Sequence, residues 1–70
     1  MRYAVVIEES LEGYGAYVPD MPGCVAAAKT REGVVRLIHE AIAFHLQGLR
    51  EDGKEIPQPH SSIEFVDVAA

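Results

Sequence analysis

The chain has 70 residues, of which 49% are hydrophobic and 24% are charged, a balance typical of one small globular domain and unlike a disordered chain. Six Lys and Arg residues against eleven Asp and Glu residues give a formal net charge of −5, and the cations are spread along the sequence. Because nucleic-acid binding depends on clustered cations that neutralise phosphates, this charge argues against direct contact with nucleic acid. It favours a basic protein partner, although solubility alone explains it equally well.

The small size predicts self-association. A domain of this length buries a small core and usually needs a disulfide, a metal or a second subunit. The single cysteine, Cys24, excludes an internal disulfide, and the three histidines lack the spacing of zinc ligands. No apolar run approaches the ~18 residues of a membrane span, and Met1 leads directly into a strand-like run. We therefore expect a cytoplasmic homodimer or higher homo-oligomer with no signal peptide, membrane contact, metal or cofactor.

Three strands are predicted in the first half of the chain. Residues 3–8 are apolar almost throughout and rich in β-branched side chains, which favours a strand with both faces covered. A polar link ending at Gly13 leads to a second strand over residues 14–18, and so short a link pairs the two antiparallel. Residues 25–28 are expected to run back as a third strand, although alanine is a poor strand former.

A long helix follows the third strand. Thr30 is the predicted N-cap residue, and Gly33 stands where a capping box would have Glu or Gln. The helix is expected to end at residue 51 or 52, with Gly53 at the C′ position. On a helical wheel, its apolar side chains span a wider arc than contact with one sheet requires. The remainder of the arc suggests contact with a second subunit or simply a well-covered helix.

A fourth strand is predicted over residues 63–68, after the proline-rich connector 56–60. The order β-β-β-α-β and a right-handed crossover place this strand beside the first, in the sheet order 3-2-1-4 with one helix on one face. The fold class is therefore α+β, in a single domain over residues 1–70. The other face of so small a sheet would lack cover, which is a second reason to expect a partner.

The loop between the second and third strands is the candidate binding surface. Its two prolines and its glycine make it rigid, so that it would lose little entropy on binding a partner. A corner that merely joins two strands is the alternative explanation. The candidate partner-binding residues are Pro19, Asp20, Met21, Pro22, Gly23 and Cys24.

The run from Tyr14 to Val25 (YGAYVPDMPGCV), together with Thr30, the long helix and the segment EDGKEIP over residues 51–57, resembles the HicB-like antitoxin family. The resemblance covers nearly the whole chain. It implies a partial ribonuclease-H-like fold, a bacterial or archaeal cytoplasmic protein, and a HicA-type partner toxin that is small, basic and cleaves messenger RNA. The chain departs from the family pattern before and within the helix, because it has Ala28, Lys29 and Gly33 where the family often has Gly, an acidic or polar residue, and Glu.

Many members of that family carry a DNA-binding segment after this module. Here the sequence stops directly after the fourth predicted strand, so we expect no operator binding by this chain alone. The primary hypothesis is a non-catalytic antitoxin that sequesters its toxin. The alternative is an orphan HicB-like oligomeric module with no toxin, which binds another protein or a small ligand.

An enzyme is the least favoured of the hypotheses. A metal-dependent nuclease would need carboxylates that converge on metal ions, whereas Glu64 and Asp67 are three apart in a strand and point to opposite faces, and Glu8 closes another strand. Cys24 has no histidine near it in sequence, and a buried residue behind a turn explains it better than a nucleophile. His45 lies near the centre of the apolar arc and is read as a core or interface residue.

Overall fold

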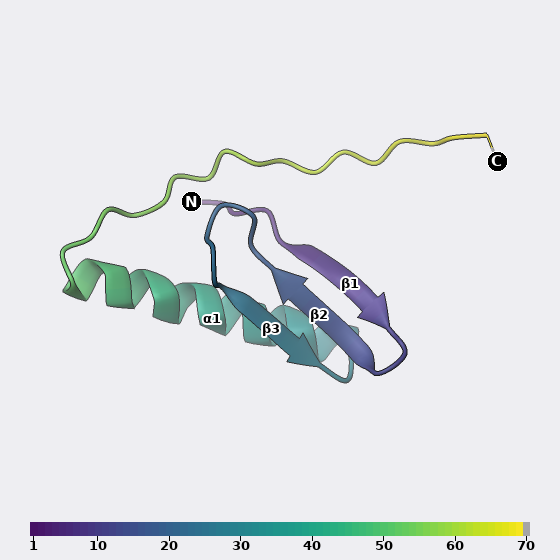
Figure 1. The fold of residues 1–70 in the computed structure, drawn as a ribbon, viewed down its shortest axis with the longest axis horizontal. Helices are drawn as coiled ribbons and strands as arrows, with labels where there is room; N and C mark the ends of the chain where they lie inside the picture. The colour runs from purple at the N-terminus through teal and green to yellow at the C-terminus, as the bar shows by residue number, and fades with distance from the viewer. Residues whose placement is uncertain (70) are drawn as a thin grey trace.

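The computed structural model describes residues 1–69. Figure 1 shows an antiparallel sheet, one long helix and an extended C-terminal tail. The elements, in chain order, are β1 (Val6–Ser10), β2 (Gly13–Tyr17), β3 (Val25–Ala28) and α1 (Arg31–Glu51). The α+β class and the first four elements of the predicted order are confirmed. Within the described range, no helix has the length and apolar character that crossing a bilayer requires.

The two hairpins have a regular register. Ala16 in β2 stands opposite Ile7 in β1 and Ala26 in β3. The first strand begins at Val6 instead of residue 3, because the chain opposite residues 3–5 has already left β2 and entered the proline-containing loop. Gly13 has a φ of +141°, and a Cβ there would lie 2.5 Å from the backbone oxygen of Ala28. The β1–β2 turn therefore requires glycine at this position.

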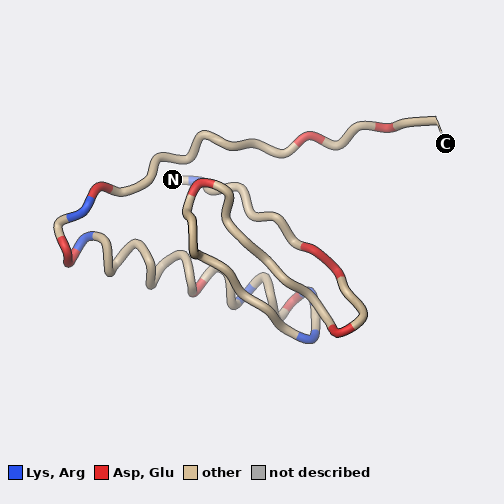
Figure 2. Tube along the Cα trace, viewed as in Figure 1, with Lys and Arg blue, Asp and Glu red and all other residues tan. Residues whose placement is uncertain are grey.

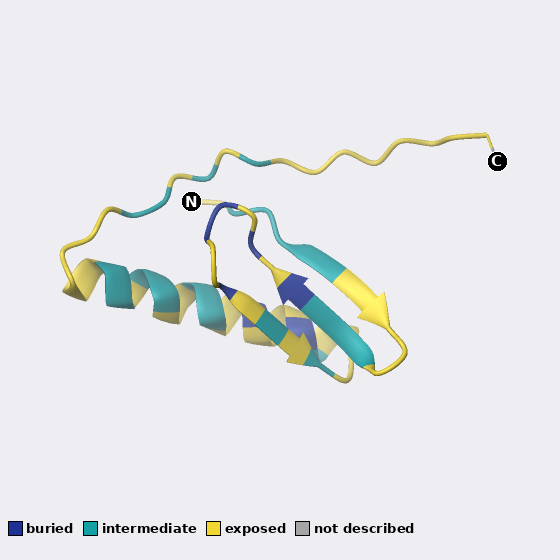
Figure 3. Cartoon of the chain, in the orientation of Figure 1, coloured by how far each residue is buried: buried dark blue, intermediate teal, exposed yellow. Residues whose placement is uncertain are grey.

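One face of the sheet packs against α1, and the core lies between them (Figure 3). Val34 and Ile38 are the fully buried residues of the helix, and Met21, in the loop after β2, is completely buried. Apolar side chains on the two flanks of the same helix, such as Val35 at 40% and Phe44 at 78% exposure, have no such cover. The chain therefore covers the middle of the predicted apolar arc and leaves its two edges exposed. The buried core residues are Ala16, Val18, Met21, Cys24, Val34 and Ile38.

Both predicted helix ends are confirmed. The hydroxyl of Thr30 accepts a hydrogen bond from the backbone N–H of Gly33 at 3.0 Å. At the other end, Gly53 takes a φ of +67°, and the N–H of Lys54 donates to the carbonyl of Leu49 at 2.9 Å. This pattern is a Schellman motif, in which the left-handed glycine lets the chain fold back onto the last turn. The helix therefore stops where local chemistry dictates.

The predicted fourth strand is wrong for the described chain. Residues 63–68 are extended but make no strand ladder. The sheet of the described chain therefore has three strands, and only the part 3-2-1 of the predicted order 3-2-1-4 is observed. The tail is held at Ser61, and Phe65 lines a hollow together with Val5 and Ile7, but the backbone of residues 63–68 makes no ladder with β1. The side chains of Phe65 and Val68 are 91% and 78% exposed.

The family pattern of Gly at position 28 and Glu at position 33 yields a test of helix initiation. A Cβ on Gly33 would lie 2.9 Å from Oγ1 of Thr30 and 3.3 Å from Cβ of Ala28. We expect Gly33→Glu alone to bring no gain in the free energy of unfolding, because its Cβ would crowd Oγ1 of Thr30 and, less closely, Cβ of Ala28. Adding Ala28→Gly removes the second contact and gives the glutamate room to complete a capping box, so the two changes should couple favourably by about 0.5–1 kcal/mol.

Urea denaturation of the two single variants and the double variant measures this coupling. Gly48→Ala is the control, because a Cβ there meets nothing within 4 Å and should stabilise the helix by about 0.5–1 kcal/mol. Strictly additive effects at positions 28 and 33 would contradict the steric explanation.

Candidate functional site

The loop between β2 and β3 is held by its own backbone. The N–H of Met21 donates to the carbonyl of Val18 at 3.0 Å, and the N–H of Cys24 donates to the carbonyl of Met21 at 3.1 Å. The N–H of Val18 donates in turn to the carbonyl of Cys24 at 3.3 Å, which closes the loop. Gly23 has a φ of +86°, which L side chains rarely adopt. The loop therefore has the rigidity that its prolines predict.

The six predicted binding residues divide between the core and the surface. Asp20, Met21 and Cys24 are buried, with Met21 at 0% exposure, whereas Pro19, Pro22 and Gly23 are exposed. Met21 therefore contributes to the core, and the outer side of the loop consists of two prolines and a glycine.

Two apolar side chains extend this outer side onto the sheet. Tyr17 and Val25 stand opposite each other as the last pair of the β2–β3 hairpin before its connecting loop, and they are 41% and 64% exposed. Ala16 and Val18 on either side of Tyr17 are buried, so Tyr17 points to the sheet face opposite the helix. Alternation along β2 was the signal that could have identified these residues. We call the resulting surface the hairpin patch, which consists of Tyr17, Pro19, Pro22, Gly23 and Val25.

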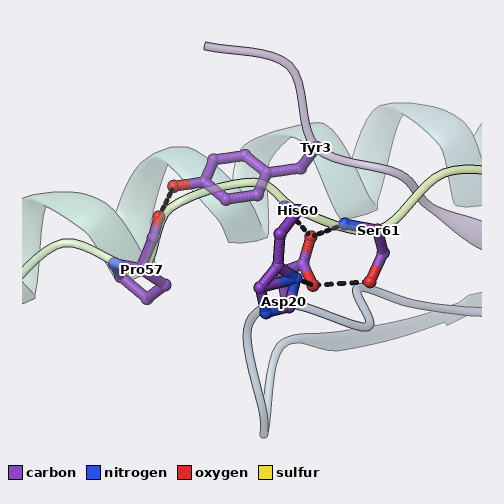
Figure 4. A network of polar contacts seen from close by, with 5 residues as sticks. All are labelled: Tyr3, Asp20, Pro57, His60 and Ser61. Carbon is purple, nitrogen blue, oxygen red and sulfur yellow. Dashed lines mark hydrogen bonds and ion pairs between the residues drawn. The ribbon is translucent and has the colours of Figure 1, made fainter.

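The buried side chain of Asp20, which belongs to this loop, binds the C-terminal tail (Figure 4). Its Oδ2 accepts the backbone N–H groups of His60 and Ser61, each at 2.9 Å. Its Oδ1 accepts the hydroxyl of Ser61 at 2.6 Å and lies 2.6 Å from Nδ1 of His60. The hydrogen bond from the Ser61 hydroxyl is the main cause that lowers the pKa of Asp20, and the two backbone N–H groups add to it against the opposing effect of burial. A second tie lies nearby, where the hydroxyl of Tyr3 donates to the carbonyl of Pro57 at 2.5 Å.

This group of serine, histidine and aspartate is not arranged for nucleophilic catalysis. The hydroxyl of Ser61 donates to the carboxylate of Asp20, and the lowered pKa of that carboxyl makes it a weak base for taking the proton of a nucleophilic serine. The side chain of His60 is 78% exposed and contacts the same carboxylate. The arrangement is a clamp that fastens residues 60 and 61 to the β2–β3 loop, and we call it the Asp20 clamp.

The other candidate chemistry is dispersed. Glu8, Glu64 and Asp67 are exposed, and the described part of the chain contains no group of three or more His, Cys, Asp or Glu residues that could hold a metal ion. Cys24 is a free, buried thiol, and burial raises its pKa, which disfavours the reactive thiolate. His45 is half-buried on α1, in agreement with its reading as a core or interface residue.

The Asp20 clamp predicts a defined response to Asp20→Asn. Because the folded pKa of Asp20 lies below its usual value of 3.8, the stability that the carboxylate confers is present at neutral pH and is lost as the pH falls through the folded pKa. At pH 7, the variant should have a Tm lower by at least about 5 °C, and this difference should shrink in acid.

Thermal unfolding from pH 7 down to about pH 2 measures this difference, and amide hydrogen exchange at His60 and Ser61 should be faster in the variant. Asp52→Asn is the matched control at an exposed aspartate and should leave the Tm within about 2 °C of the parent. A pH-independent difference between the parent and Asp20→Asn would contradict the role assigned to the ionised carboxylate.

Burial of Cys24 predicts a slow thiol. In the folded chain at pH 8, a disulfide reagent should modify Cys24 at least about 100-fold more slowly than in denaturant, because the sulfur is inaccessible and its pKa is raised. Absorbance of the released thiolate measures the rate. A native rate close to the denatured rate would show an accessible thiol and would reopen a nucleophilic role.

With this geometry established, comparison with known proteins identifies the family. Residues 3–69 match the family described as HicB-like antitoxin of bacterial toxin–antitoxin systems. A 14.9 kDa protein of the rep-hol intergenic region of Haemophilus phage HP1 is 36% identical over 67 residues, which are 96% of this chain and 50% of that protein. Antitoxin HicB 2 of Photorhabdus laumondii is 34% identical over 71 residues, which are 100% of this chain and 51% of the antitoxin. The chain thus spans about half the length of these relatives.

Solved structures agree. A chain in the structure of a HicA3 and HicB3 toxin–antitoxin complex superimposes with a TM-score of 0.73 at 32% identity, over 86% of this chain and 70% of that one. The crystal structure of the antitoxin HicB3 gives a TM-score of 0.70 at 32% identity, over 86% of this chain and 44% of the antitoxin. The match of the family model over nearly the whole sequence, with the shared fold, means that this chain belongs to the HicB-like antitoxin family.

Proposed function

We propose that this chain is an antitoxin that binds a small, basic, HicA-type toxin and blocks its cleavage of messenger RNA. The observation that carries the proposal is the likeness of this fold to a chain in the HicA3–HicB3 complex. The chain catalyses no reaction of its own in this proposal. It acts by covering a surface of the toxin that RNA must reach, which requires a rigid interface and complementary charge but no reactive group.

Charge supplies the attraction to a basic partner. The net charge of −5 and the exposed carboxylates of Glu8, Glu9 and Glu12 at the β1–β2 hairpin (Figure 2) would draw a basic protein toward this chain from a distance. The same charge disfavours phosphate groups. Glu32 also stands among the cations at the start of α1, between Arg31 and Arg36. We therefore propose no direct contact with nucleic acid.

The hairpin patch supplies the contact surface. It combines an aromatic side chain, Tyr17, with the backbone and rings of a loop that is already fixed in one conformation. Aromatic anchors carry much of the energy of protein interfaces, and a rigid loop loses little entropy when it is bound. The exposed members of the predicted binding loop thus keep their proposed role, and Tyr17 and Val25 join them.

The remaining expectations about the chain are part of the same proposal. An antitoxin that protects messenger RNA acts in the cytoplasm, and we place this chain there. We propose one domain over residues 1–70, because the loop, the sheet and the helix contribute to one hydrophobic core. The partial ribonuclease-H-like arrangement, which needs a strand in the fourth position, stays a prediction for this chain.

The decisive experiment is purification of the tagged chain from its own cells, followed by a ribonuclease assay. The proposal expects a small basic ribonuclease to co-purify in stoichiometric amount, to cleave messenger RNA when it is isolated, and to lose that activity when the chain is added back. Recovery of the chain alone would favour the orphan oligomeric module. Recovery of a basic protein whose activity is unaffected would also overturn the antitoxin proposal.

The contact surface has its own test. Tyr17→Ser combined with Val25→Thr should weaken toxin binding by about 10–100-fold, because both apolar side chains leave the interface while the core beneath is unchanged. Leu11→Ser is the matched control, because Leu11 is 106% exposed on the opposite hairpin and should change binding by less than about twofold. Isothermal titration calorimetry with the co-purified toxin measures both. Equal effects of the two variants would place the contact elsewhere.

A further inference from the structure

The loop that carries half of the hairpin patch is also the loop that the tail holds. Pro19 is exposed and belongs to the patch, its neighbour Asp20 belongs to the Asp20 clamp, and the next residue, Met21, is completely buried in the core. Three consecutive residues thus face the solvent, the tail and the core. Because they share one short stretch of backbone, Asp20 cannot change direction without moving Pro19.

The inward position of Asp20 depends on donors that the tail supplies. Its side chain is 1% exposed. Within residues 1–69, the hydrogen bonds to its carboxylate come from His60 and Ser61 alone. Without these donors the carboxylate would be a buried charge with no partner, which is strongly unfavourable. Turning the carboxylate toward water relieves that cost, but it requires the loop to leave its present shape.

The tail can leave the loop while the rest of the fold stays in place. The hydroxyl of Tyr3 holds the carbonyl of Pro57 separately from the clamp (Figure 4), so the connector stays attached when the clamp opens. Residues 58–69 contribute no side chain to the hydrophobic core and no strand to the sheet. The structure therefore allows two local states, one with the tail docked and Asp20 inward, and one with the tail released and the loop rearranged.

We propose that docking of residues 60 and 61 on Asp20 sets the hairpin patch in the shape that binds the toxin, so that the tail controls toxin affinity. The inference rests on the antitoxin role proposed above and adds a control to the same surface. Asp20 and Ser61 are then positioning residues, which act on the toxin without touching it. The coupling is reciprocal, because a toxin that binds the docked state better must also hold the tail in place.

The thiol of Cys24 reports the shape of the loop without any toxin. It is buried in the same loop, and its backbone N–H donates to the carbonyl of Met21. Ser61→Pro removes both the backbone N–H and the hydroxyl that residue 61 donates to Asp20. A disulfide reagent should therefore modify Cys24 at least about tenfold faster in this variant than in the parent.

Ser62→Pro is the matched control for the thiol measurement. Ser62 is an exposed serine one position further along the tail and takes no part in the Asp20 clamp, so this change should leave the rate at Cys24 within about twofold of the parent. Amide exchange at His60 shows whether the tail is released. An unchanged thiol rate in Ser61→Pro would overturn the proposal, whether the tail has stayed docked or the loop has kept its shape without it.

Toxin affinity is the second readout. In calorimetry with the co-purified toxin, well below the Tm of each variant, Ser61→Pro should weaken binding by about 10–100-fold and Ser62→Pro by less than about twofold. Equal affinities of Ser61→Pro and the parent would overturn the inference and leave the antitoxin role standing. A parent chain that binds no toxin would overturn the antitoxin role itself, and the tail's control of toxin affinity with it.

A second substitution tests whether the carboxylate is the link. Adding Asp20→Asn to Ser61→Pro replaces the unpaired buried charge with a neutral amide, which is less costly to bury. The double variant should therefore bind the toxin at least about fivefold more tightly than Ser61→Pro alone. Affinity that the asparagine fails to restore would show that the tail acts by touching the toxin directly, and would overturn the positioning role of Asp20.

Reciprocity is measured on the parent chain. Saturating toxin should slow amide exchange at His60 and Ser61, although the hairpin patch does not include these residues. Exchange at the amide of Ser62 is the internal reference for general changes in the tail. Unchanged exchange at residues 60 and 61 in the complex would contradict the coupling.

Discussion

The carboxylate of Asp20 holds together the two parts of the chain that the rest of the structure depends on. It lies in the loop after β2 and accepts hydrogen bonds from His60 and Ser61, forty residues further along. A buried carboxylate needs such donors, because an unpaired charge inside a protein is costly. The contact therefore gives the buried carboxylate its hydrogen-bond donors and also fixes the position of the tail at residues 60 and 61. The group resembles catalytic machinery in composition, but the group that accepts the proton of Ser61 is a carboxylate of lowered pKa, which is a weak base.

The β2–β3 loop serves two purposes through its two sides. Met21 and Cys24 complete the core under α1, and Pro19, Pro22 and Gly23 face solvent beside Tyr17 and Val25. A loop packed from within holds its outer surface in one shape without support from a partner. This is the property that the proposed antitoxin role needs, because covering a toxin requires a preformed surface and no reactive residue. The isolated, buried thiol and the scattered carboxylates fit the same role.

The chain is incompletely covered along one side, and several features converge there. The β1 edge, the flank of α1 that carries Val35, and the tail beyond Ser61 each leave backbone or apolar groups exposed. A domain of this size buries too little surface to leave such groups without cost.

Local signals in the sequence determined the first four elements, the cap at Thr30, the left-handed Gly53 and the rigidity of the Pro19–Cys24 loop, because each depends on residues within a few positions. Alternation along β2 places Tyr17 on the face opposite to Ala16 and Val18, but the burial of Met21 and the pairing of Asp20 with Ser61 depended on how the helix and the tail pack against the sheet, which no local pattern encodes. The position of residues 63–68 was likewise beyond sequence reasoning. Their composition specifies a strand, but a strand needs a partner edge, and only the tertiary structure decided that the chain's own edge stays open.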